Sequence, residues 1–305
     1  MIIEQAFYKN IPAIRLTTKT TRAVIVPAQG GKMVSFQAHD NNAECLLQNR
    51  APSFLPMGLA DDFERCECAG FDDMFPTIDP VNVICEDGTA LDYPDHGEIC
   101  RLPFSAEVCE NKLTLRAYSH LLDCAYEKAF TEADDGKLQI SYRIENRSAR
   151  DLNVLWAAHF LLNVEKGGQL LLPFEKGEPT DIVDAPTDPS KQGARLPLSD
   201  ELLLTNWPQN TPDCRKLYFP RKAPAGFVGY LSPSGSTFML EFDREKLPYI
   251  GLWINLGYLH GDYCVGIEPA THGYDTVKNA EAHGQRQLLK KGATLCFSLK
   301  LSVDR

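Results

Sequence analysis

Apolar residues occur at every second position in several segments of the chain. The pattern is clearest in 138–146 (LQISYRIEN) and returns in 113–117, 238–242 and 295–303. Successive side chains of a strand point to opposite faces, so this alternation predicts antiparallel strands with one face on a core. Gly-, Pro-, Asp- and Ser-rich turn sequences such as 232–235 (SPSG) separate the segments.

Strands joined by turns over nearly the whole chain predict an all-β protein, a large antiparallel β-sandwich. We expect residues 1–305 to form a single domain. The segment 173–224 holds nine of the twenty prolines. Because proline fixes φ and removes a ladder donor, we expect an irregular loop region there, with a division into two domains as the alternative. A short helix is expected at 200–205, capped by Ser199 or Asp200.

The charge of the chain is concentrated in one stretch. The whole chain carries −10, while 61–98 contains twelve acidic residues and one basic residue, Arg65. Phosphate binding needs concentrated positive charge, so a nucleic-acid partner is not expected. The sequence has no apolar run near the ~20 residues of a membrane span, so we expect no membrane association. It does not begin like a signal peptide, and we expect a cytoplasmic protein with reduced thiols at its ten cysteines.

Two segments of the acidic stretch carry candidate ligand-binding groups. In 71–76 (FDDMFP), Asp73 is either a hydrogen-bond acceptor for a hydroxyl-rich ligand or part of a solvated loop. In 95–101 (DHGEICR), His96 and Arg101 supply donors that suit sugar hydroxyls, or they belong to a surface salt-bridge cluster. A bulge at Gly97 would bring these two side chains to one face of a strand.

Three further residues stand out in apolar strands. His159 lies in 156–163 (WAAHFLLN), either as a satisfied core histidine or as a catalytic group. Glu268 precedes a proline at the end of 265–271 (VGIEPAT), and a buried carboxylate needs a hydrogen-bonding or catalytic reason. Trp253 is either a core residue or an apolar surface on which a sugar stacks.

In this order, the segments resemble the aldose 1-epimerase (mutarotase) family of the galactose mutarotase-like superfamily. The segment 95–101 is similar to the family's H-G-x-x-R motif, and 159–163 (HFLLN) is similar to its H-x-x-F-N motif, with Leu162 in place of phenylalanine. The segment 267–271 (IEPAT) resembles the strand with the catalytic Glu-Pro pair. The early turn 29–35 and the strand 136–146 also fit, so the resemblance covers most of the chain.

The resemblance implies a β-sandwich enzyme that interconverts the α and β anomers of a neutral aldose without a cofactor or metal. It implies that Glu268 is the general base, His159 the general acid, and that His96 acts on the side of the ring oxygen. Arg101 would bind ring hydroxyls. The family's substrate-binding aspartate has no clear counterpart between His159 and Glu268, and Asp73 is the candidate for that role.

Two other functions remain open from the sequence. A non-catalytic carbohydrate-binding protein on the same fold would need no matched acid and base. A hexose-phosphate 1-epimerase would need a basic cluster, for which the basic residues of 215–222 are candidates. The acidic stretch favours a neutral sugar over a phosphorylated one, since carboxylates accept hydrogen bonds from hydroxyl groups and repel anions. Calcium ligation by the acids of 61–73 is disfavoured, because their spacing fits no EF-hand loop.

Overall fold

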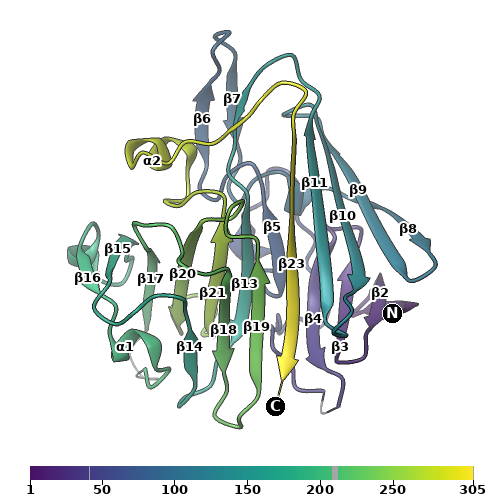
Figure 1. Ribbon diagram of the computed structural model, residues 1–305, viewed down its shortest axis with the longest axis vertical. Coiled ribbons are helices and arrows are strands. Elements are labelled where there is room, and N and C mark those ends of the chain that lie inside the picture. Colours follow the sequence, from purple (N-terminus) through teal and green to yellow (C-terminus); the bar gives the residue numbers. More distant parts are fainter. Residues whose placement is uncertain (41, 208–211, 305) are drawn as a thin grey trace.

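Two large antiparallel β-sheets face each other in the computed structural model, which describes residues 1–40, 42–207 and 212–304 (Figure 1). The first sheet has eleven strands, in the order β1 (Ile2–Tyr8), β2 (Ile11–Thr17), β3 (Thr21–Val26), β4 (Lys32–Ala38), β5 (Phe71–Met74), β13 (Ala157–Asn163), β21 (Tyr263–Ala270), β20 (Tyr249–Leu256), β17 (Asp213–Tyr218), β15 (Pro179–Asp184) and β16 (Arg195–Pro197).

The second sheet has eight strands, in the order β14 (Gln169–Leu171), β18 (Phe227–Leu231), β19 (Thr237–Phe242), β23 (Thr294–Asp304), β11 (Leu138–Asn146), β10 (Cys124–Glu132), β9 (Lys112–Ser119) and β8 (Ser105–Cys109). Two small pairs, β6 (Val81–Ile84) with β7 (Ala90–Tyr93) and β12 (Leu152–Asn153) with β22 (Leu288–Leu289), complete the strands. The helices of the described residues are short: α1 (Asp200–Leu203), α2 (Val277–Ala282) and the 3₁₀ turns η1 (Phe63–Arg65), η2 (Ile99–Arg101) and η3 (Pro189–Lys191). In Figure 1, the β6–β7 hairpin and α2 lie together beyond one end of the sheets.

The period-two segments form strands, and the prediction of an all-β antiparallel fold is confirmed. In β11, the alternating apolar side chains are buried against the opposite sheet, and the strand pairs with β10 on one side and β23 on the other. The expected short helix is α1, which follows Ser199 at its N-cap. Among the described residues, none of the helices has the length and apolar character needed to cross a bilayer. All ten cysteines lie in the described parts of the chain and are free.

The segment 173–224 is more regular than we expected. It contains β15, β16 and β17, which pair with one another or with β20 at one end of the eleven-stranded sheet. The prolines among its described residues stand at strand termini or between strands, as at Pro179 and Pro197. The strands of 173–224 matter for the candidate site, because β17 contributes Lys216 to it.

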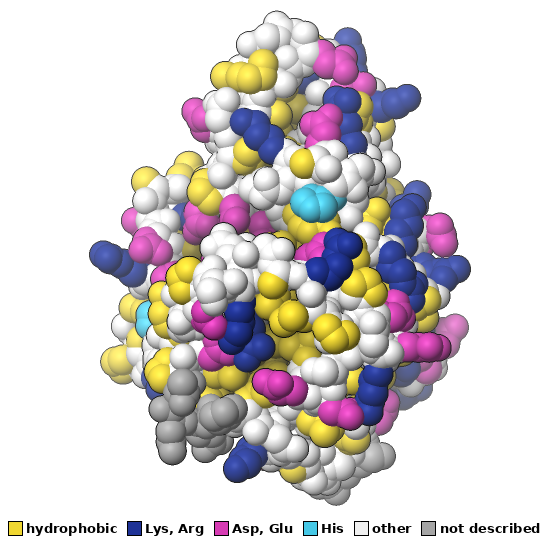
Figure 2. Space-filling model, turned by 90° about the vertical axis from the view of Figure 1, so that its left-hand side faces the viewer, with side chains coloured by type: hydrophobic (Ala, Val, Ile, Leu, Met, Phe, Trp, Pro, Cys, Tyr) yellow, Lys and Arg dark blue, Asp and Glu magenta, His cyan; other side chains and the backbone are white. Residues whose placement is uncertain are grey.

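The face of the molecule seen in Figure 2 shows an area of hydrophobic side chains bordered by charged ones.

The two faces of the eleven-stranded sheet have different chemistry. Phe160, Ile267 and Leu252 are neighbours in the register, and their side chains belong to the hydrophobic core. The opposite face of the sheet carries a row of buried polar side chains, which we call the polar row. One residue from each of β4, β5, β13, β21 and β17 belongs to it, in this order: Lys32, Asp72, His159, Glu268 and Lys216. Because side chains alternate along a strand, the same five strands supply both the core and this row of buried ionisable groups.

Candidate active site

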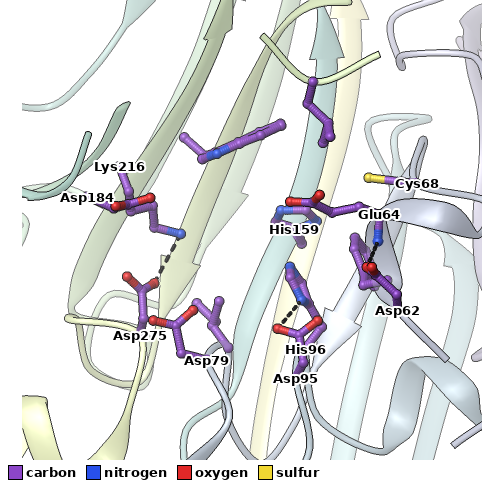
Figure 3. A pocket seen from close by; sticks show the side chains of 14 residues that line it. Asp62, Glu64, Cys68, Asp79, Asp95, His96, His159, Asp184, Lys216 and Asp275 are labelled. Carbon is purple, nitrogen blue, oxygen red and sulfur yellow. Dashed lines mark hydrogen bonds and ion pairs between the residues drawn. The ribbon is translucent and has the colours of Figure 1, made fainter. Parts of the chain in front are cut away.

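A cavity of about 260 Å³ opens over the polar row (Figure 3). His159 and His96 lie on one side of it, and Lys216, Asp275 and Asp79 lie on the other. The complete lining consists of Asp62, Phe63, Glu64, Cys68, Ile78, Asp79, Asp95, His96, His159, Asp184, Lys216, Trp253, Leu259 and Asp275. The strands and the loops around them therefore bring together groups from eight separate parts of the sequence.

Glu268 and His159 lie side by side at the floor of the cavity. Oε1 of Glu268 is 3.9 Å from Nε2 of His159. Glu268 is fully buried and does not itself line the cavity, whereas His159 does. Oε1 of Glu268 and Nδ1 of His159 are buried and have no hydrogen-bond partner. Buried polar atoms are normally paired, and these two are among seven buried side-chain atoms of the described residues that have no partner.

Burial shifts both groups toward their neutral forms. It raises the pKa of Glu268, an effect that Lys216 partly offsets. It also lowers the pKa of His159 well below its ordinary value, and the nearby His96 and Lys216 add to that effect. The His159 imidazole is therefore neutral at neutral pH and can accept a proton.

Gly266 makes room for the Glu268 side chain. The two residues are on the same face of β21, and a Cβ at Gly266 would lie 3.1 Å from Oε1 of Glu268 and 3.2 Å from Cβ of Trp253. Both distances are tighter than ordinary van der Waals contacts. A side chain at this position would push the carboxylate away from His159.

Sequence reasoning did not place Lys216 and Asp275 beside Glu268 in the candidate site; Lys216 was considered only as part of a phosphate-binding cluster. Nζ of Lys216 contacts Oε2 of Glu268 and lies 3.1 Å from Oδ1 of Asp275. A signal for Lys216 was present, because this lysine is in phase with the buried Cys214 and Tyr218 in β17. Asp275 lies in a turn with φ of 63°, and no periodic pattern marks it.

His96 is held against the cavity by a stacked ring and a carboxylate. Its ring lies parallel to that of Phe63, with centroids 3.8 Å apart, and its Nδ1 is 2.9 Å from Oδ1 of Asp95. The two histidine rings are 5.5 Å apart. His96 and Gly97 have φ of 56° and 73°, so this segment is a tight turn rather than the bulged strand we expected. The turn directs the His96 side chain into the cavity without a strand bulge.

Arg101 is not in the cavity lining, and its role in binding ring hydroxyls stays a prediction. It lies in η2, where its guanidinium donates to the carbonyl oxygens of Gly58, Asp61, Asp95 and Gly97 at 2.7 to 3.1 Å. It is buried. Four of its five N–H donors are therefore used to fasten the loops that carry Phe63 and His96. Arg101 therefore stabilises the loops that form this wall of the cavity without lining the cavity itself.

Asp73 is also placed away from the cavity. The segment 71–74 is the strand β5 and not a loop, so Asp72 and Asp73 point to opposite faces of the sheet. Asp73 faces the second sheet, where it contacts Nζ of Lys128 at 2.7 Å and accepts a hydrogen bond from the Tyr142 hydroxyl at 2.9 Å. Asp72, on the cavity side, is paired with Lys32.

Trp253 and a set of carboxylates form the rest of the wall. Trp253 is partly exposed and lines the cavity, with its ring 6.4 Å from that of His159. Six acidic residues line the cavity against one lysine. Burial and the neighbouring Asp275 raise the pKa of Asp79 to about 6. Among the described residues, no three His, Cys, Asp or Glu side chains are grouped so that they could hold a metal ion.

Comparisons with known proteins agree on the fold. A family model described as a domain of unknown function (DUF4432) matches residues 223–303. No curated protein sequence matches the chain. A galactose mutarotase-like protein from Clostridium acetobutylicum is similar with a TM-score of 0.72 at 14% identity, over 100% of this chain and 99% of that one.

Two further solved structures have the same architecture. The Slr1438 protein of Synechocystis sp. PCC 6803 is similar with a TM-score of 0.70 at 15% identity, over 98% of both chains. A galactose mutarotase related enzyme from Lactobacillus acidophilus is similar with a TM-score of 0.67 at 10% identity, over 96% of this chain and 97% of that one. These similarities extend over nearly the whole of each chain. The protein has the galactose mutarotase-like fold.

Proposed function

We propose that this protein is an isomerase that interconverts the α and β anomers of a neutral aldose by acid and base catalysis. The observation that carries the proposal is the pair formed by His159 and Glu268, two buried neighbours that each keep a polar atom without a partner beside a solvent-accessible cavity. Ring opening needs a base at the anomeric hydroxyl and an acid at the ring oxygen, and groups of this kind typically contribute ~10²–10⁴-fold in rate.

In this proposal His159 is the group that removes the proton of the anomeric hydroxyl. Its imidazole is neutral and lines the cavity, while Glu268 is fully buried beside its Nε2. The Glu268 carboxylate stabilises the imidazolium that forms, since opposite charges attract strongly in a buried site. This order differs from the roles that the family resemblance implies, in which Glu268 acts directly as the base.

His96 completes the proposed reaction on the side of the ring oxygen. Its ring lies 5.5 Å from that of His159 and is oriented by Asp95 and Phe63. As His96 protonates the ring oxygen, the ring opens. The aldehyde then rotates about the C1–C2 bond, and the reverse steps close the ring on its other face. Trp253 offers an apolar surface to the sugar ring, and the wall carboxylates accept hydrogen bonds from its hydroxyls.

Replacing Glu268 tests the proposal. We expect Glu268→Gln to lower the catalysed rate about 10²- to 10⁴-fold, because a neutral amide cannot stabilise an imidazolium. Polarimetry of freshly dissolved α-glucose and α-galactose measures that rate. The matched control is Glu245→Gln, the same change at a side chain that is 79% exposed. Full activity in the Glu268 variant would remove Glu268 from the acid/base pair.

Polarimetry together with a sugar-binding measurement distinguishes the proposed function from a non-catalytic carbohydrate-binding protein and from a hexose-phosphate 1-epimerase. Saturable sugar binding without anomer exchange in the unmodified protein would identify a carbohydrate-binding protein. Anomer exchange restricted to hexose phosphates would identify a hexose-phosphate 1-epimerase. The six carboxylates of the cavity wall favour the neutral sugar, since they repel an anionic substrate.

A further inference from the structure

One ammonium group lies between two buried carboxylates at the edge of the cavity. Nζ of Lys216 contacts Oε2 of Glu268 and is 3.1 Å from Oδ1 of Asp275. The Tyr218 hydroxyl donates to the same oxygen of Asp275 at 2.6 Å. All three charged side chains are buried. The arrangement is therefore fixed by contacts and does not depend on the positions of flexible surface groups.

A single positive charge cannot balance two carboxylates. With Glu268 and Asp275 both ionised, the three groups carry a net charge of −1, and a proton on Glu268 brings that charge to zero. Charges interact strongly in a buried site, where water does not screen them. An opposite charge favours the ionised form of a carboxyl group, and a like charge favours the protonated form.

We propose that Lys216 and Asp275 are positioning residues that act on Glu268 in opposite senses. Lys216 favours the ionised carboxylate and turns its free oxygen Oε1 toward His159, while Asp275 favours the protonated form and keeps Lys216 in place. The proposal rests on the proposed function only in the use it gives to Glu268, because the balance of charges exists whether or not a sugar is converted.

The electrostatics of the individual groups agree with this assignment. Burial raises the pKa of Glu268, Asp275 adds to the rise, and Lys216 opposes it. Burial disfavours the charged form of Lys216, but Asp275 and Glu268 outweigh that effect and raise its pKa. Lys216 therefore stays an ammonium at neutral pH and is not a proton donor in the reaction. Two other acidic groups of the cavity lining, Asp79 and Asp184, lie on the same side as Lys216, and Asp79 interacts with both Asp275 and Lys216. His159 and His96 lie on the opposite side.

The proposal is tested by measuring the titration midpoint of the Glu268 carboxyl group in two variants, in which we expect it to move in opposite directions. Protein labelled with ¹³C at the glutamate carboxyl carbon is titrated by NMR, and the Glu268 signal is assigned with Glu268→Gln. We expect Lys216→Met to raise the midpoint of that signal by about 1–3 pH units, and Asp275→Asn to lower it. The matched control is Lys222→Met, which removes a nearby exposed lysine and leaves the midpoint unchanged. Midpoints that move in the same direction, or not at all, would overturn the proposal.

Asp275→Asn and one more variant protect the test from a loss of folding. Asp275→Asn keeps the size of the side chain and the main-chain carbonyl, which accepts from the amides of Ile78 and Asp79. Its lowered midpoint is decisive by itself if Lys216→Met does not fold. Tyr218→Phe removes the hydrogen bond to Asp275 without changing a charge, and we expect the midpoint to move much less than in Asp275→Asn. A shift as large as that of Asp275→Asn would contradict the electrostatic role.

Activity gives a second readout that distinguishes this proposal from the proposed function. If the unmodified protein exchanges anomers, the acid limb of its pH–rate profile moves up in Lys216→Met and down in Asp275→Asn. If it does not, the proposed function fails while the NMR titration still decides the roles of Lys216 and Asp275. Unmoved acid limbs in both variants of an active enzyme would overturn the proposal.

Discussion

At the residue scale, buried charged side chains fall into two kinds. Arg101 uses its donors on the carbonyl oxygens of four surrounding residues. Glu268 and His159 each keep an atom without a partner. Burial is similar in all three cases. The pairing of the polar atoms, and not the exposed fraction, therefore distinguishes Arg101 from Glu268 and His159.

Arg101→Ala tests this distinction. Its loss leaves four carbonyl oxygens without their donor, and we expect the free energy of unfolding to fall by about 3 kcal/mol. Urea denaturation measures this change, with Arg65→Ala, at a side chain 86% exposed, as the control. An increase in KM at unchanged stability would instead show that Arg101 binds the substrate directly.

At the element scale, the sequence predicted strands better than it predicted their orientation. The alternation in β11 and β23 specified both the strand and its buried face, because one face is apolar along its whole length. In β5, all four residues are buried, and the pattern FDDM does not show which aspartate faces the cavity. The histidines and Glu268 could be predicted from motifs. Lys216 and Asp275 become neighbours of Glu268 only through pairing between distant strands and a turn.

The inward orientation of Asp73 predicts an effect on stability alone. Asp73→Asn leaves the Lys128 ammonium buried between the sheets without an anion, and we expect a loss of about 3–5 kcal/mol in the free energy of unfolding. We expect KM for the sugar to be unchanged. Asp92→Asn, at an exposed position of the β6–β7 hairpin, is the control for chemical denaturation. An Asp73 variant with unchanged stability and weakened sugar binding would contradict this prediction and identify Asp73 as a sugar-binding residue.

At the scale of the whole molecule, buried neutral histidines make stability depend on acid. His272, in the turn after β21, is buried, and burial lowers its pKa to about 4 despite its contacts with the carbonyl oxygens of Gly273 and Val154. Its ordinary pKa is about 6.5 in the unfolded chain. The unfolded state therefore binds the proton first. The stabilisation is fully present above pH ~6.5 and is lost as the pH falls through the folded-state value.

This linkage predicts the behaviour of a His272 variant. Between pH 7 and pH 4, the unmodified protein should lose about 3 kcal/mol more stability than His272→Gln, which has no proton to bind in this range. Urea unfolding at a series of pH values measures the difference. His120→Gln, at an exposed position, should follow the unmodified protein. Parallel curves for the unmodified protein and His272→Gln would contradict the prediction.

The polar row has a consequence for how the site comes into existence. Its members lie between positions 32 and 268, and neighbours in the row are at least 40 positions apart in the sequence. The segment 223–303 matched by a family model contains Glu268 but neither His159 nor Lys216. Contacts so distant in sequence form late, because a long loop must close before each one. The neighbourhood of His159 and Glu268 is thus a property of the finished fold, and under the proposed function recovery of activity on refolding would report the completion of the eleven-stranded sheet.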